Sequence, residues 1–191
     1  MHGEKRERVL RVILNEPGGS LTKYRVAKLA KISTAWTQEF FNELEKKGIT
    51  KGTKVVDVQA AYDYWASITQ SSIYFDFFVQ SPREFLKESG LKYAVTTYQA
   101  ENLLNHYLFI SRVDACVLKK DIPKWKELIV SNGLVGKGNL RLLIADEHVF
   151  YAKQKVNEMW LASTPQVLVD LRREGGVCRE ACDMMVANHV R

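Results

Sequence analysis

Six basic side chains lie in two short stretches of the N-terminal third of the chain. Four of them fall within Thr22–Lys31, which contains no acidic residue, and the other two are Lys51 and Lys54. Between these stretches, Gln38 and Asn42 carry amides of the kind that hydrogen-bond adenine in a duplex. Lysine and arginine neutralise phosphates without reading sequence. These residue types therefore indicate binding to a polyanion, although a basic helix is also typical of a merely solvated surface.

Three carboxylates at expected strand ends, Asp114, Asp146 and Glu147, are the strongest candidates for catalysis. A nuclease holds its divalent metal ions with such groups. Acidic residues at strand ends are more commonly turn formers or helix caps. We therefore expect the protein not to be an enzyme, and a metal-dependent nuclease stays as the weaker alternative.

Two cysteines, Cys178 and Cys182, are spaced to share one face of a helix, and His189 follows them. A structural zinc site usually takes four ligands, and Cys116 or another histidine would have to supply the fourth. Buried cysteines on an apolar helix face explain the spacing better. We therefore expect no metal and no cofactor.

Other signatures of chemistry are weak. Gly19-Ser20 has no paired acids behind it, as a nucleotidyltransferase requires, and Gly136-Lys137-Gly138 lacks the spacing of a phosphate-binding P-loop. The aromatic run Ile73–Phe78 suits base stacking or partner docking, but we expect it to pack in the core. An apolar pocket for a small effector is a further interpretation of the C-terminal part.

Apolar periodicity, helix caps and glycine breaks predict the elements that must position the basic residues. Ser33 or Thr34 is expected to cap the third helix and Gly48 to end it. The expected elements are, in order, helices at Glu4–Asn15, Lys23–Ala30 and Ala35–Lys47, strands at Ile49-Thr50 and Val55-Val56 joined by a basic loop of residues 51–54, and a helix at Asp57–Ile68.

Helix, helix, turn, helix and basic hairpin is the order of a winged helix-turn-helix domain. Residues 21–56, LTKYRVAKLAKISTAWTQEFFNELEKKGITKGTKVV, resemble the winged-helix core of many prokaryotic regulators, with L-E-K-K-G ending the recognition helix. The resemblance implies that this helix enters the major groove and that the hairpin lies near the backbone. Winged helices also serve as protein-docking modules. The residues then expected to contact DNA are Lys23, Arg25, Lys28, Lys31, Thr34, Ala35, Trp36, Gln38, Asn42, Lys51 and Lys54.

The charge of the chain is concentrated in the same segment. The 191 residues carry 28 Lys and Arg against 22 Asp and Glu, and 46% are hydrophobic, as in a folded globular protein. Residues 1–70 hold 12 basic and 8 acidic side chains, a balance of +4, whereas residues 71–191 hold 16 and 14, a balance of +2. We therefore expect the anionic partner to bind the N-terminal part.

Composition also bears on location. Three cysteines cannot all pair within the chain, and the start MHGEKRERVL is charged where a secretory signal would be apolar. The longest apolar runs are far shorter than the roughly 20 residues of a membrane helix. We expect a cytoplasmic protein with no membrane segment.

The polar segment Thr69–Ser72 is the expected boundary between a domain of residues 1–70 and a domain of residues 71–191. Strand-like and helix-like segments alternate in the second domain, so the expected class of the whole chain is α+β, with a mixed α/β second domain. Ser81 begins a capping-box sequence. The expected strands are Ile73–Val79, Val113–Leu118, Asn139–Ala145 and Val149–Ala152, and the expected helices are Pro82–Ser89, Thr97–Tyr107, Asp121–Asn132, Pro165–Arg173 and Cys178–Val186.

The end of the second domain suggests a family. Residues 160–185, WLASTPQVLVDLRREGGVCREACDMM, resemble the end of the AbiEi-type antitoxin and regulator family, which has a V-S-x-x-Q-L-x-x-D-L helix, a glycine break and a helix with E-A-A-like residues. Here Ala162–Leu171, Gly175-Gly176 and Glu180–Cys182 stand at those positions. Residues 138–150, GNLRLLIADEHVF, resemble the family's sheet strand and acidic turn.

This resemblance implies a DNA-binding autoregulator. Such an antitoxin represses its own operon through the winged helix, while its second domain counters a nucleotidyltransferase-like toxin. Winged-helix regulators usually read paired half-sites, so the resemblance also implies a homodimer or cooperative pair on double-stranded DNA. A stand-alone regulator, a protein that mainly holds a toxin, and the nuclease remain open as other interpretations.

Overall fold

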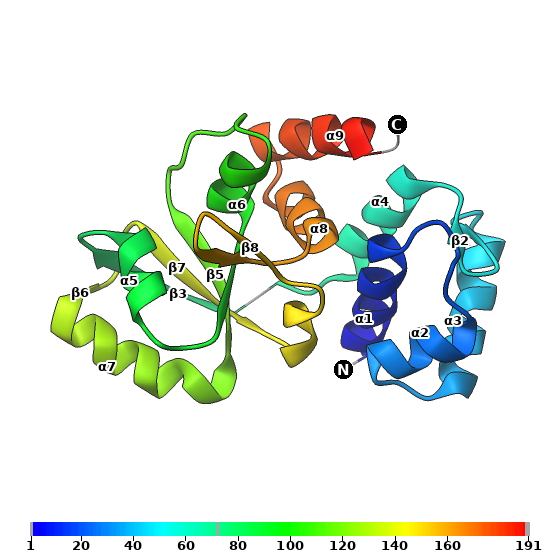
Figure 1. Cartoon of the computed structure of the whole chain (residues 1–191), viewed down its shortest axis with the longest axis horizontal. Helices are drawn as coiled ribbons and strands as arrows, with labels where there is room; N and C mark the ends of the chain where they lie inside the picture. The colour runs from blue at the N-terminus through cyan, green and yellow to red at the C-terminus, as the bar shows by residue number, and fades with distance from the viewer. Residues whose placement is uncertain (1, 72, 190–191) are drawn as a thin grey trace. The chain divides into compact units, whose positions relative to one another are not determined.

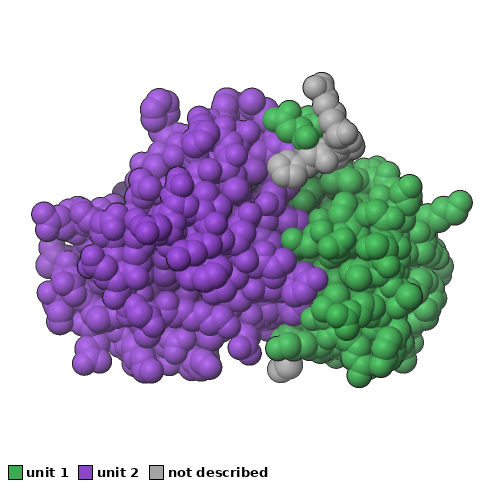
Figure 2. Space-filling view, viewed as in Figure 1, with its two compact units in different colours: residues 1–70, 186–191 green, residues 71–185 purple. Residues whose placement is uncertain are grey.

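The structure is a computed structural model that describes residues 2–71 and 73–189; Met1, Ser72, Val190 and Arg191 lie outside it. The architecture is mixed α+β, so the expected class is confirmed (Figure 1). The chain divides into two compact units, residues 1–70 with 186–191 (unit 1) and residues 71–185 (unit 2), coloured separately in Figure 2. Within the described residues, no helix combines the length and apolar character needed to cross a membrane.

Unit 1 consists of helices around a small apolar core, followed by a hairpin. Its helices begin where the sequence supplies an oxygen for the first free N–H groups: Thr22, Ser33 and Asp57 accept from the amides of Arg25, Trp36 and Ala60. The core includes the fully buried Leu10, Ile13, Phe41, Leu44 and Trp65. The elements are α1 (His2–Asn15), α2 (Lys23–Ala30), α3 (Thr34–Lys46), β1 (Thr50–Lys51), β2 (Lys54–Val55) and α4 (Val58–Ile68).

The hairpin differs from its expected form. Residues 51–54 were expected to form a loop, but Lys51 and Lys54 lie on β1 and β2 and pair directly across the ladder. The turn between them is only Gly52-Thr53, with Gly52 at φ 62°, a conformation that lets a two-residue turn close. The hairpin is held to the segment after α1, since Val55 donates its N–H to the Pro17 carbonyl and the Thr53 hydroxyl donates to the Leu21 carbonyl.

Unit 2 is built on a seven-stranded mixed sheet in the order β6-β3-β7-β5-β4-β9-β8. Its two central strands, β5 (Val113–Leu118) and β7 (Leu140–Ala145), run parallel to each other and coincide closely with the expected sheet centre. The other strands are β3 (Tyr74–Val79), β4 (Tyr93–Thr96), β6 (Gly133–Val135), β8 (Gln154–Val156) and β9 (Met159–Leu161). The helices are α5 (Pro82–Glu88), α6 (Thr97–Leu104), α7 (Ile122–Asn132), α8 (Thr164–Glu174) and α9 (Val177–His189), with 3₁₀ turns at Lys119–Asp121 and Glu147–Phe150.

Side-chain alternation assigns the helices of unit 2 to opposite faces of the sheet. Thr96 donates its hydroxyl to Asp170 of α8, so α8 lies on the face that Thr96 shares with its partner Asp114. Lys126 of α7 lies over the ring of Phe75, which points to the other face. The rings of Phe85 on α5 and Trp125 on α7 are 6.1 Å apart, and Trp125 is fully buried. The sheet is therefore covered by helices on both faces over its central part.

Several expected elements of unit 2 were wrong or missed. Val149–Ala152 was expected as a strand, but residues 147–150 form a 3₁₀ turn that begins where Asp146 accepts the His148 amide. The helix expected to reach Tyr107 ends at Leu104, and its last turn is completed by Asn105 donating its amide to the Glu101 carbonyl. The Ser81 side chain makes no capping hydrogen bond. Strands β4, β6, β8 and β9 were not expected.

A very short crossing joins β6 to β7. Both strands pair with β3, one on each edge, so residues 136–139 must pass over β3 to connect them. Gly138 lies against the Phe77–Phe78 peptide, and a Cβ placed there would be 2.2 Å from the Phe77 carbonyl oxygen. Only a residue without a side chain fits this crossing.

Candidate nucleic-acid interface

The outer face of α3 presents small and polar side chains. Thr37, Phe41 and Leu44 are buried, as expected, which turns Gln38 and Asn42 to solvent together with Thr34 and Ala35. Gln38 donates from Nε2 to Asn42 Oδ1 at 3.2 Å. The two amides are therefore neighbours on one turn and already share one hydrogen bond.

Trp36 occupies a different position from its neighbours on α3. It is only partly exposed and stacks on the ring of Phe40, with the ring centroids 5.2 Å apart. The Lys5 ammonium of α1 lies 5.9 Å from the Trp36 ring. Trp36 therefore packs against α3 and α1 more than it projects outward, while the carboxylate of Glu39 is exposed beside Gln38.

Arg25, Lys28 and Lys31 are all exposed and none forms an ion pair with a carboxylate of the described residues. Arg25 and Lys28 lie on α2, where the Lys28 ammonium lies 5.5 Å from the Tyr24 ring. Lys31 stands in the turn before α3 with φ 57°, the left-handed conformation that ends α2. These three charges remain free to meet an external anion.

Lys23 is different, because it is already paired. Its ammonium lies 3.7 Å from Glu45 Oε1 on α3, and the Lys23 side chain is only 25% exposed. The same Glu45 oxygen accepts the Gly52 amide of the hairpin turn at 2.9 Å. Glu45 of α3 thus connects α2, through its ion pair with Lys23, to the hairpin, through the Gly52 amide.

Lys51 and Lys54 form a cross-strand pair of like charges. Directly opposite residues on an antiparallel pair share one face, and like charges there destabilise the hairpin. Both side chains are exposed, and neither has a carboxylate partner within the described residues. An anion bound between them would relieve their repulsion.

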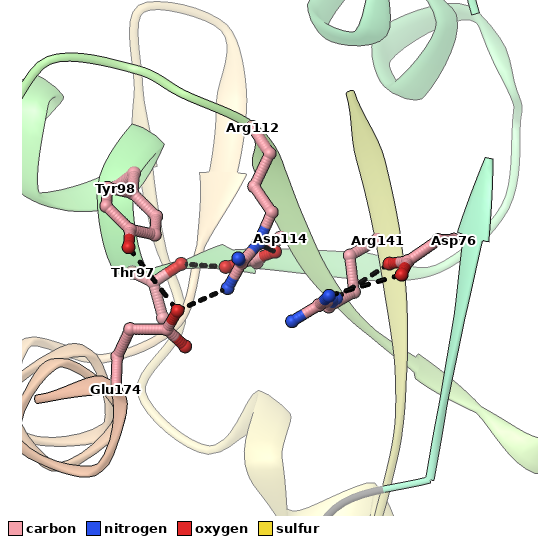
Figure 3. Close-up of polar contacts among 7 residues, drawn as sticks. All are labelled: Asp76, Thr97, Tyr98, Arg112, Asp114, Arg141 and Glu174. Carbon is pink, nitrogen blue, oxygen red and sulfur yellow. Dashed lines mark hydrogen bonds and ion pairs between the residues drawn. The ribbon is translucent and has the colours of Figure 1, made fainter. Parts of the chain in front are cut away.

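Arg112 and Arg141 of unit 2 are held by carboxylates, as Figure 3 shows. Arg112 lies 2.6 Å from Asp114 and 2.8 Å from Glu174, and Thr97 donates its hydroxyl to the buried Asp114. Burial opposes the charge of Arg112, but the hydrogen bonds and charges of the two carboxylates outweigh it, so the pKa of the guanidinium is raised above its ordinary value.

A second pair lies beside this cluster. Arg141 of β7 donates from two nitrogens to Asp76 of β3, at 2.7 and 3.2 Å, directly across the ladder (Figure 3). The hydrogen bond to Asp76, partly opposed by burial, raises the pKa of Arg141 above its usual range. Sequence reasoning missed the roles of Arg112 and Arg141. Asp114 is only two residues from Arg112, but Glu174 and Asp76 lie 62 and 65 residues from the arginines that they hold, and no local spacing indicates these pairs.

The three carboxylates expected as the alternative catalytic set do not come together. Asp114 stands at the first half of β5 opposite Arg141, whereas Asp146 follows the last residue of the parallel strand β7. Five residues along a strand separate them by about 16 Å. Asp114 is also fully engaged by Thr97 and Arg112, and Glu147 pairs with Lys92 at 3.7 Å. The arrangement gives no support to a nuclease.

The three cysteines are buried, and none of them forms a disulfide. Cys178 and Cys182 share a face of α9, as expected, and Cys116 lies on the central strand β5. Burial raises the pKa of the Cys178 thiol, which disfavours the thiolate that binds metals. The side chain of His189, the remaining zinc candidate, lies outside the described side chains. Within the part of the chain that is described, no group of three or more His, Cys, Asp or Glu side chains could hold a metal ion.

The expectation that the Ile73–Phe78 aromatics pack in the core is wrong for two of them. Phe77 is buried, but Tyr74 and Phe78 are half exposed, at 49% and 50%. Strand alternation explains this, since Tyr74 and Phe78 share the face opposite to Phe77. These exposed rings are therefore available to a ligand or partner.

No protein-family model, curated protein or solved structure matches the chain.

Proposed function

We propose that the protein is a transcription regulator that binds double-stranded DNA through unit 1, which acts as a winged helix-turn-helix domain. In this proposal α3 enters the major groove, with Gln38 and Asn42 reading base edges. Arg25, Lys28 and Lys31 meet phosphates on one side of the groove. The hairpin acts as the wing.

The cross-strand pair Lys51–Lys54 is the observation that carries the proposal. Two unpaired ammonium groups facing each other on a two-residue turn cost stability, which a folded protein recovers when a phosphate lies between them. Three further unpaired cations precede α3, and its exposed face is small and polar. Solvation of a helix alone does not explain why unpaired cations gather beside the small, polar face of α3.

The test is binding of the full chain to duplex DNA from upstream of its own gene, followed by fluorescence anisotropy across a salt series. Each phosphate contact contributes a slope of about 0.9 in log K against log salt. Lys28→Ala and Lys31→Ala should each lower the slope by about one contact. Gln38→Ala should weaken the specific site by about tenfold but leave non-specific binding unchanged.

Lys23 and Arg25 provide a matched pair for this test. Both are cations on the first turn of α2, but only Lys23 is paired with a carboxylate. Arg25→Ala should reduce the slope by about one contact, and Lys23→Ala by less than half of that. Lys124→Ala, an exposed lysine on α7 of unit 2, should change nothing. Promoter affinity that is insensitive to Arg25→Ala, Lys28→Ala, Lys31→Ala and Gln38→Ala at moderate salt would overturn the proposal.

The resemblance to AbiEi-type proteins extends the proposal to an autoregulating, antitoxin-like repressor that binds its operator as a homodimer or cooperative pair. A second candidate is a protein that mainly holds a nucleotidyltransferase-like toxin. It is favoured by the exposed apolar side chains near strand β6, Phe78, Val130, Leu134 and Val135. Co-purification with the product of a neighbouring toxin gene, abolished by Leu134→Lys, supports it, whereas a neighbourhood without such a gene removes it.

A further inference from the structure

A groove of about 790 Å³ surrounds the first half of β3 in unit 2. β6 pairs with β3 from Phe77 to Val79, and the Asp76 carbonyl accepts the Gly136 amide, so among the described residues this edge of the strand is open along Tyr74 and Phe75. The volume falls within the range of pockets that hold small organic ligands. The side chains and backbone that line it are those of Tyr74–Phe77, Arg112, Lys126, Val135–Gly138 and Arg141.

Two of the four cations in this lining are unpaired. Arg112 and Arg141 are bound by carboxylates, as described above, but Lys126 and Lys137 have no carboxylate partner within the described residues. The Lys126 ammonium lies 4.7 Å from the Phe75 ring, on the face of β3 opposite to Tyr74. Lys137 is exposed on the crossing segment that joins β6 to β7. The groove therefore carries free positive charge at one end.

The crossing segment adds backbone donors to this charge. Gly136 donates its amide to the Asp76 carbonyl, but the amides of Lys137 and Gly138 make no hydrogen bond within the described residues. Two consecutive free N–H groups next to an ammonium are suited to a phosphate, which accepts several hydrogen bonds at once. Gly138 also permits close approach of a ligand to the backbone because it has no side chain.

The other end of the groove, on the opposite face of β3, is aromatic. The Tyr74 ring is half exposed, and the Arg141 guanidinium lies 4.0 Å from its centroid. Because Asp76 holds that guanidinium in place through two hydrogen bonds, ring and cation form a fixed stack. Nucleobases stack on tyrosine rings and on guanidinium planes.

We propose that this groove binds a nucleotide around the edge of β3, with its phosphate at Lys126, Lys137 and the loop amides and its base on the other face, against Tyr74 and Arg141. The shared chemistry is a phosphate joined to a flat base, supplied either by a free nucleotide or by a nucleotide within a single strand. This site lies in unit 2 and does not depend on duplex binding by unit 1.

The experiment titrates the full chain by isothermal titration calorimetry with four probes: AMP, inorganic phosphate, adenosine and a ten-nucleotide single-stranded oligothymidylate. AMP should bind saturably and at least tenfold more tightly than phosphate or adenosine alone. Lys126→Ala combined with Lys137→Ala should weaken AMP about tenfold or more. Tyr74→Ala should reduce AMP affinity to that of phosphate while phosphate binding is retained.

Matched variants separate this site from general charge. Lys124→Ala on the same helix as Lys126, and Lys28→Ala with Lys31→Ala in unit 1, should leave AMP binding unchanged. Tight oligothymidylate binding with weak AMP binding, lost in the Lys126 and Lys137 double variant, assigns the site to strand-borne nucleotides. The proposal is overturned if neither probe saturates, or if the unit 1 variants and not the unit 2 variants abolish binding. Circular dichroism melts of every variant exclude unfolding as the cause.

Discussion

Three arginines of unit 2 and two cations of unit 1 differ in what surrounds them. In unit 2, Arg112, Arg141 and Arg172 each lie within 3.0 Å of a carboxylate oxygen. In unit 1, Arg25 and Lys31 have no such partner among the described residues. The balances of +4 and +2 therefore understate the contrast. A cation that is already paired with a carboxylate of the same chain contributes little to binding an external anion. The charge that a unit offers to a partner is therefore the charge of its unpaired cations.

The largest test of this contrast removes a carboxylate from unit 2. Asp114 is 1% exposed and accepts hydrogen bonds from Arg112 and Thr97. The backbone of Thr97 has a φ of 49°, which is strained for a β-branched residue. Asp114→Ala should lower the free energy of unfolding by about 3–5 kcal/mol, because Arg112 loses a buried partner. Urea unfolding of the full chain measures this.

Glu147→Ala is the matched control, since that carboxylate is 62% exposed and its ion pair with Lys92 is long. It should cost about 0–1 kcal/mol. Neither change should alter DNA affinity. An equal loss in the free energy of unfolding for the two variants would contradict the idea that the buried ion pairs of unit 2 stabilise its fold.

The next effect concerns the crossing over β3. Gly138→Ala forces a Cβ to within 2.2 Å of the Phe77 carbonyl oxygen, so the backbone must shift. We expect a loss of about 1–3 kcal/mol, the usual cost of overpacking. Gly18→Ala, with no atom within 4 Å of the added Cβ, is the control and should be neutral or slightly stabilising. Thermal unfolding of both variants beside the unchanged chain decides this prediction.

A smaller effect of opposite sign is expected in the unit 1 hairpin. Lys51→Glu replaces a like-charge pair by an opposite-charge pair with Lys54 and should stabilise the unit by about 0.2–1 kcal/mol. The same change should weaken promoter binding and reduce its salt slope, since a phosphate contact is lost. The stability and the promoter affinity of Lys51→Gln should lie between those of the unchanged chain and those of Lys51→Glu. If stability and affinity rise together, the hairpin does not face the phosphates.

The smallest effect is a pH dependence within unit 1. Burial, together with the hydrogen bond that Tyr64 donates to Glu43, raises the pKa of Tyr64 from 10.0 to about 12. The folded state therefore favours the protonated phenol, so the stabilisation is complete below pH 10 and is lost as the pH rises through 12. Tyr64→Phe should show a shallower loss of melting temperature across that window. If the melting temperatures of the unchanged chain and of Tyr64→Phe depend on pH in the same way, Tyr64 does not cause the pH dependence.

Unit 1 was largely predictable because its signals are local. Thr22, Ser33 and Asp57 cap helices a few residues away, and Gly48 adopts φ 73° at the break after α3. Such features act on the nearest turn of chain and can be read one segment at a time. The pairing of Lys23 could not be read in this way, since Glu45 reaches it only after α2 and α3 pack together.

Unit 2 was less predictable because its short strands depend on distant partners. β4 is buried on both faces, so Tyr93–Thr96 shows no alternation, and it pairs with β9 more than 60 residues later. β6 has only three residues and exists by pairing with β3. The groove follows from this incomplete pairing, so no periodicity in the sequence could indicate it.

The segment that crosses β3 has a consequence for the order of assembly. Among the described residues, β6 pairs with no strand but β3, which lies more than 50 residues earlier, whereas β5 and β7 are close in sequence and pair over six residues. The centre of the sheet is therefore expected to nucleate first, with β3 added next and β6 last. In the native state the reverse order should govern opening, so amide hydrogens of residues 133–135 should exchange with deuterium before those of residues 113–118. Transient release of β6 would widen the groove beside Tyr74 without disturbing the rest of the sheet.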